Sequence, residues 1–192
     1  MANEPAITGQ DFGAFPLSDV AHLPNVTVAF PGEHWSNRKA NEVIVPGEAV
    51  IPVNSGGALA MRRAHAADQG DPRLAIALRE VMVPDINPGS IYNPTLGPNE
   101  IRNLALPVGA YVHAYYSGAF HLTLCQARAW VGGEMVAWDE TAARPPSKGL
   151  SGTGNWIVTT DPTKAFFEVM EFRPVNASNE GILTVRSLRS QF

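Results

Sequence analysis

Two histidines in the middle of the chain are the first candidates for a metal site or an acid–base pair. His113 and His121 lie on either side of Ser117-Gly118, within two runs rich in aromatic and β-branched residues, 111–116 and 119–125. A small polar residue followed by glycine between two such runs predicts a two-residue β-hairpin. In that register the two imidazoles point to opposite faces of the sheet. The other three histidines are isolated in the sequence, so we predict no metal and no cofactor.

The single cysteine, Cys125, would need a neighbouring base to act as a nucleophile. In the hairpin register His121 shares its face of the sheet, but no signature of a cysteine enzyme surrounds the residue. One cysteine cannot form an internal disulfide. In a strand such a residue is most often a small buried hydrophobic group, which is the reading we favour.

Two further patterns invite a catalytic interpretation. Residues 149–154, GLSGTG, resemble a phosphate-binding loop, but the Gly-Lys-Ser/Thr ending is missing and residues 156–160 have strand character where a helix would be needed. Glu134 and Asp139 could form a carboxylate pair, but their five-residue spacing places them on opposite faces of a regular strand. We therefore expect a surface loop, two solvated acids and no enzymatic activity.

Length and composition indicate one β-rich domain. The 192 residues include 17 glycines and 16 prolines and only 17% charged residues, which suits many short strands joined by tight turns. The net charge is −4 and the longest basic run is Arg62-Arg63, which argues against nucleic acid as a partner. No window approaches the ~20 apolar residues of a membrane span, and residues 1–13 lack a signal-peptide pattern. We expect a product made in the cytoplasm, with no membrane partner.

Apolar runs alternate with turn residues over most of the chain. Residues 73–81 fit either a helix or a strand, and we favour the strand because the β-prone run continues to Pro84. The other predicted strands are 42–45, 49–53, 58–61, 101–106, 111–116, 119–125, 132–139, 156–160, 165–172 and 181–186. The pattern predicts a mainly β fold, a compact antiparallel β-barrel or sandwich of the β-tulip or jelly-roll kind. Residues 106–139 are expected to be its hub.

Residues 1–41 differ from the rest of the sequence. They carry large apolar residues without a period, interrupted by four prolines. We predict an extended N-terminal arm, 1–41, followed by a β domain, 42–192; an alternative is that this segment covers one end of its own barrel. Residues 84–98 and 140–154 are rich in proline and glycine and are predicted to be long loops, a feature typical of functional or partner-bound segments.

Two short segments share a pattern. PGEAV at residues 46–50 and GGEMV at residues 132–136 each place an acidic residue and an apolar strand start after a glycine. Two matches of five residues do not establish a repeat. They predict that one turn-into-strand geometry is used twice in the fold.

The first of these segments, together with VMVPD at residues 81–85, WVGGEMVAWD at 130–139 followed by RPP at 144–146, and EGILTVRSL at 180–188, resembles the head cement or decoration proteins of tailed bacteriophages. The likeness runs from residue 42 to the C-terminus and leaves the arm unmatched. It implies a compact β domain on the outside of the capsid that bridges neighbouring major capsid protein subunits. The family has no catalytic residues, so the resemblance implies none in this sequence.

The resemblance implies two partners, the major capsid protein and further copies of this chain, with a trimer favoured over a dimer. We expect apolar anchors from the arm and the proline-rich loop, and cations that meet an acidic capsid surface or keep a loop solvated. The candidates are Phe12, Phe15, Trp35, Ile91, Tyr92, Arg144 and Lys148. The alternatives are a virion-surface domain that binds the host or a carbohydrate, and a small cupin-like β-barrel enzyme.

Overall fold

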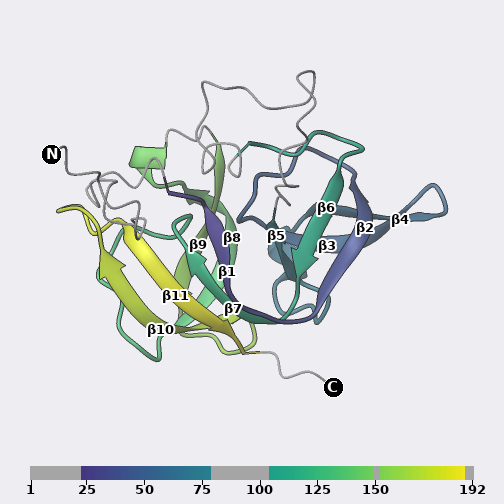
Figure 1. Cartoon of the computed structure of the whole chain (residues 1–192). Helices are drawn as coiled ribbons and strands as arrows, with labels where there is room; N and C mark the ends of the chain where they lie inside the picture. Colours follow the sequence, from purple (N-terminus) through teal and green to yellow (C-terminus); the bar gives the residue numbers. More distant parts are fainter. Residues whose placement is uncertain (1–22, 79–103, 149–151, 189–192) are drawn as a thin grey trace, which may run out of the picture.

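The computed structural model describes residues 23–78, 104–148 and 152–188, which form a mainly β molecule in two parts (Figure 1). The strands are β1 (Val26–Pro31), β2 (His34–Ala40), β3 (Ala49–Ser55), β4 (Ala58–Arg63), β5 (Ala75–Leu78), β6 (Tyr111–Tyr115), β7 (Gly118–Leu122), β8 (Met135–Ala143), β9 (Thr153–Thr159), β10 (Phe167–Pro174) and β11 (Gly181–Ser187). Two short 3-10 helices are η2 (Ala66–Asp68) and η3 (Pro146–Lys148).

One part is a closed barrel and the other is a curled sheet. The barrel runs β2-β4-β3-β5-β6 and closes through pairing of β6 with β2. Its β2–β4 pair is parallel and its other pairs are antiparallel. The six-stranded sheet has the order β1-β7-β11-β10-β8-β9 and is antiparallel throughout. The prediction of a mainly β, barrel-type fold is therefore confirmed.

The predicted hairpin at Ser117-Gly118 is wrong, although both of its strands exist. β6 pairs with β2 and β5 in the barrel, whereas β7 pairs with β1 and β11 in the sheet. The residues between them form a crossover from one part to the other. Gly118 has φ +123°, a conformation that favours glycine. The Ser117-Gly118 pattern therefore predicts a turn correctly, but the turn leads from the barrel into the sheet and does not form a hairpin.

The predicted boundary at residue 41 is also wrong for the described residues of the arm. β1 is an edge strand of the sheet and β2 closes the barrel, so residues 26–40 belong to both parts of the body. The apolar residues here lack a single period because the segment changes sheet after Pro31. The arm prediction for residues 1–22 falls outside the described residues.

Most other predicted strands are confirmed, with shifted ends. Residues 73–81, which fit either a helix or a strand by sequence, form strand β5 in their described part. Strands β9, β10 and β11 lie where the sequence predicts them. β8 extends to Ala143 and β9 begins at Thr153, so the loop predicted for residues 140–154 is shorter than expected. A strand irregularity between Asp139 and Ala143 explains the loss of pattern in that stretch.

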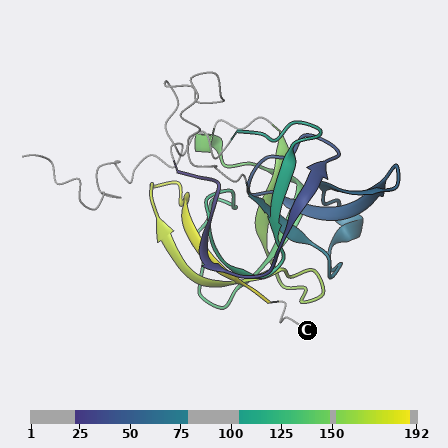
Figure 2. The ribbon, with the colours of Figure 1, turned by 45° about the vertical axis from the view of Figure 1, so that its right-hand side comes forward.

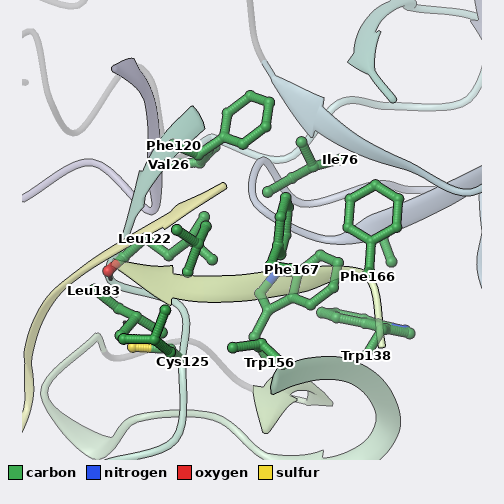
Figure 3. Close-up of a cluster of buried hydrophobic side chains, with 14 of the residues drawn as sticks. Val26, Ile76, Phe120, Leu122, Cys125, Trp138, Trp156, Phe166, Phe167 and Leu183 are labelled. Carbon is green, nitrogen blue, oxygen red and sulfur yellow. Dashed lines mark hydrogen bonds between the residues drawn. The ribbon is translucent and has the colours of Figure 1, made fainter. Parts of the chain in front are cut away.

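Two hydrophobic clusters hold the body together. The smaller one fills the barrel and includes Val50, Met61 and Val112. The larger one lies between barrel and sheet and contains the aromatic side chains shown in Figure 3. The labelled residues are Val26, Ile76, Phe120, Leu122, Cys125, Trp138, Trp156, Phe166, Phe167 and Leu183.

Two tryptophans of the sheet bind the barrel by hydrogen bonds as well as by packing. Trp138 donates its Nε1 hydrogen to the carbonyl of Ala64 at 3.1 Å, and Trp156 donates to the carbonyl of Gly47 at 2.7 Å. The Trp156 ring also lies 4.8 Å from the Phe167 ring, and such aromatic pairs contribute about 0.5–1.5 kcal/mol beyond their burial. These contacts join the two parts into one body.

Candidate contact surface

The two central histidines do not form a site together. His113 is in the barrel strand β6, where its ring stacks on His34 with centroids 4.4 Å apart, and His121 is in the sheet strand β7, where Nδ1 lies 3.0 Å from the Thr184 hydroxyl. The prediction of no joint site was based on a hairpin that does not exist. Within residues 23–78, 104–148 and 152–188, no three His, Cys, Asp or Glu side chains cluster as metal ligands would.

Cys125 is buried at 3% exposure, as predicted for a structural thiol. Burial raises the pKa of the thiol to about 12, and the nearby Lys148 ammonium offsets this only in part. A thiol with this pKa forms little thiolate at neutral pH, and the thiolate is the nucleophilic species. The environment of Cys125 does not support nucleophilic catalysis.

The predicted solvated acids have structural roles. Glu134 accepts hydrogen bonds from the Val131 amide and from both Nη atoms of Arg128. Burial raises its pKa, but these donors outweigh burial and hold the pKa below its ordinary value. Asp139 accepts from the amide and hydroxyl of Thr141, which lowers its pKa. Both carboxylates stabilise turns or strand irregularities.

Arg144 lies inside the molecule, which corrects the expectation of a loop cation. Its side chain is 5% exposed and forms an ion pair with Glu48, which is 1% exposed. Arg63 reaches the same Glu48 Oε1 at 3.0 Å, and both arginines donate to the Thr153 carbonyl. The sequence does not predict this ion pairing of Glu48, because Arg144 is 96 residues away along the chain. The cluster bridges barrel and sheet, so Arg144 is not available to another protein.

Lys148 is also buried, at 8% exposure, at the end of η3. Its ammonium donates to the carbonyl of Leu23, the first described residue. Lys148 therefore ties the chain just ahead of β1 to the sheet. Both predicted roles of Lys148, contact with an acidic capsid surface and solvation of a loop, require an exposed ammonium group and are therefore wrong.

Trp35 is the one predicted anchor that lies at an accessible position among the described residues. It is half-buried in β2, and its ring contacts the Tyr116 ring with centroids 4.7 Å apart. Trp130, Trp138 and Trp156 are buried in the core instead. Nothing local in the sequence separates Trp35 from the other three. Phe12, Phe15, Ile91 and Tyr92 lie outside the described residues.

A shallow groove of about 340 Å³ opens beside Trp35 at one end of the barrel. In the register of the barrel strands, Trp35 faces Ala114 and Pro52 faces Met61, and Ala114 and Met61 belong to the cluster that fills the barrel. The groove is therefore the mouth of the barrel. Its lining is mostly apolar and is formed by Trp35, Arg38, Pro52, Val53, Asn54, Leu59 and Arg73. We call these residues the barrel mouth.

Large apolar side chains are also exposed outside the residues that line the barrel mouth. Phe30 is 71% exposed at the end of the edge strand β1. Val131 is 64% exposed in the turn before β8, and Met170 is exposed in β10, whose residue Val169 accepts a hydrogen bond from Gly133. Val43 and Val108 are exposed within two residues of the Ile44–Leu106 bridge. The body thus presents several separate apolar contact points.

Within the described ranges no helix has the length and apolar character to cross a membrane. No family model matches the chain, and neither the curated proteins nor the solved structures give a match.

Proposed function

We propose that this protein is a structural protein of tailed-bacteriophage virions that binds the outside of the capsid and joins neighbouring major capsid protein subunits. Three of the motifs that resemble cement proteins lie in described turns and strands: PGEAV leads into β3, GGEMV leads into β8, and the C-terminal motif contains β11. VMVPD at residues 81–85 lies outside the described residues. The described part of the resemblance therefore consists of segments that build the fold.

The observation that carries the proposal is that exposed apolar side chains occur on several different elements of one body. A protein that joins neighbours needs at least two contact surfaces on a body that keeps them at a fixed distance. Phe30 lies on β1, Val131 lies in the turn before β8 with Met170 on β10, and the barrel mouth is formed by β2, β3, β4 and the segment before β5. The Glu48 cluster and the two indole hydrogen bonds hold barrel and sheet together. Single exposed apolar residues are ordinary on soluble proteins, whereas several such residues on different elements of one body can contact more than one neighbour.

Binding only to the expanded shell would stabilise it by mass action, and many copies would make weak contacts collectively strong. The energy would come from apolar burial at about 25 cal/mol per Å² removed from water. This mechanism needs no catalytic group, and it uses surface residues that the core does not require.

Co-sedimentation with assembled heads tests the proposal. The purified protein is mixed with expanded and unexpanded heads of a phage that encodes it, from which it has been deleted. We expect binding to the expanded heads in a fixed ratio to the major capsid protein, together with greater resistance of the heads to heat. Failure to sediment with either head form would overturn the proposal.

Surface variants identify the contact points. Val131→Glu combined with Met170→Glu, and separately Phe30→Glu, should reduce occupancy of the heads. Lys164→Glu, at an exposed position near the Asp161 turn, is the matched control and should bind as the unmodified protein does. Normal occupancy with all of the apolar variants would exclude these side chains as contacts.

A further inference from the structure

The barrel mouth is a mostly apolar surface that also contains two arginines. Leu59 is 52% exposed there, and Trp35, Pro52 and Val53 are only partly covered. Of the two arginines, Arg73 is paired with Asp71 at 2.8 Å, whereas Arg38 forms no ion pair with any residue that the structure describes. An occupant that fits has large apolar side chains flanked by a carboxylate.

The chain itself contains a segment with this chemistry. Residues 11–19 read DFGAFPLSD and combine Phe12, Phe15 and Leu17 with an aspartate at each end. Residues 1–22 contain no Lys or Arg. The apolar side chains match the floor of the barrel mouth, and the aspartates are complementary to Arg38.

The place where the described chain begins favours a neighbouring copy as the donor. Lys148 holds Leu23 beside η3, and Figures 1 and 2 both show η3 and the start of β1 on the side of the molecule away from the β3–β4 hairpin. Asn54 and Leu59, next to that hairpin turn, line the barrel mouth. The eleven residues from Phe12 to Leu23 span at most about 40 Å when extended. A body of this size is itself about 40 Å across, so a route around its own surface is longer than the segment.

We propose that the barrel mouth binds residues 11–19 of a neighbouring copy of this protein. Each copy then gives one segment and receives one. Such a contact is heterologous when it runs head to tail, and it closes into a ring when the rotation between copies permits. This association between copies takes place in the isolated protein and does not require capsid binding.

The first experiment measures the association of the full-length protein by sedimentation velocity over a range of concentrations. We expect a concentration-dependent oligomer. Arg38→Glu should weaken association about tenfold or more, because it places an acid opposite the aspartates. Arg173→Glu, an exposed arginine on β10, is the matched control and should leave association unchanged.

Charge exchange separates direct contact from a general effect. The double variant Asp11→Lys, Asp19→Lys should weaken association as Arg38→Glu does, and an equimolar mixture of the two variants should restore association in part, because each supplies one complementary half. No weakening with either variant, or no recovery in the mixture, would overturn the proposal.

A cysteine pair identifies the donor. Phe15→Cys and Leu59→Cys in one chain should give disulfide-linked dimers and larger species under mild oxidation, because Cys125 is buried and does not compete. A cross-link confined to single chains would show that a chain fills its own barrel mouth and would overturn the neighbour as donor. Absence of any cross-link, with monomers at all concentrations, would show that residues 11–19 do not bind there.

Discussion

Glu48 and Glu134 occupy equivalent positions in two turns that lie in different parts of the molecule. Each follows a glycine with positive φ, Gly47 at +94° and Gly133 at +87°. Each donates its amide to the carbonyl three residues earlier, and each carboxylate accepts the amide of that same residue at 2.8 Å. The first turn leads into β3 of the barrel and the second into β8 of the sheet. The repeated turn geometry predicted from PGEAV and GGEMV is confirmed.

The two glutamates differ in their surroundings, which makes them a matched pair for mutation. Glu48 is 1% exposed with Arg144 and Arg63 on one oxygen, while Glu134 is 24% exposed with Arg128. Glu48→Gln should cost about 3–5 kcal/mol at pH 7, because it leaves buried guanidinium charge without its carboxylate. Glu134→Gln should cost about 1 kcal/mol, because water screens its pair. Urea unfolding followed by tryptophan fluorescence measures both values, and equal losses would contradict this account of the Glu48 cluster.

The lowered pKa of Glu134 predicts how the effect of its substitution depends on pH. Burial raises this pKa, but the Val131 amide and the Arg128 guanidinium outweigh burial. A carboxyl group whose pKa is lower in the folded state adds stability above its unfolded pKa of about 4.3, and that stability is lost as pH falls through the folded pKa. The difference in unfolding free energy between the unmodified protein and Glu134→Gln should therefore be largest near pH 7 and shrink below about pH 4. Urea unfolding at pH 7, 5 and 3 checks this, and a difference that grows with acidity would contradict it.

Local signals in the sequence were interpreted correctly where short-range geometry decides the structure. The turns at Gly47 and Gly133 and the β3–β4 hairpin depend on glycine and strand residues that are close together in the chain. Ser117-Gly118 gave the same kind of signal, but packing of the larger core directs β7 to β1 and β11. Choice of partner strand is a long-range property that local pattern does not contain.

The same limit applies to the candidate contact surface, where contacts between residues far apart in the chain are not contained in the local pattern. The sequence predicts a loop cation at Arg144 because its partner, Glu48, is 96 residues away. Trp35 and Arg38 of β2 line the barrel mouth together with residues of β3, β4 and the segment before β5, which only the closed barrel brings together. Sequence periodicity within one strand cannot reveal such a surface.

The crossover between the two parts depends on a close backbone approach at Gly32. A Cβ atom added there would lie 2.3 Å from the Ser117 carbonyl oxygen and 2.6 Å from the Gly118 nitrogen. These are backbone atoms of the other crossover, so no side-chain rotation relieves the clash, and Glu33 donates its amide to the Ser117 hydroxyl at 2.8 Å alongside. Gly32→Ala should lower the free energy of unfolding by about 2–3 kcal/mol.

Gly132→Ala is the matched control for that substitution. Its added Cβ would meet only the Met170 carbonyl oxygen, at an ordinary 3.5 Å. The change in stability should stay within about 0.5 kcal/mol, as for most surface substitutions. Thermal and urea unfolding of both variants give the comparison, and a stable Gly32→Ala variant would show that the two crossovers can separate without cost.

The buried thiol of Cys125 predicts a chemical difference between folded and unfolded protein. Because burial raises its pKa to about 12, its thiolate fraction at pH 8 is on the order of 10⁻⁴. An aromatic disulfide reagent such as Ellman's should therefore leave the native protein unmodified over minutes at pH 8, and it should titrate one thiol per chain at once in 8 M urea, where the ordinary pKa of about 8.5 returns. A Leu59→Cys variant, with a thiol at an exposed position, should release one equivalent of chromophore in the native state and a second in urea. Rapid stoichiometric reaction of native Cys125 would mean that the core opens at this site, and it would reopen the question of a nucleophilic role for this residue.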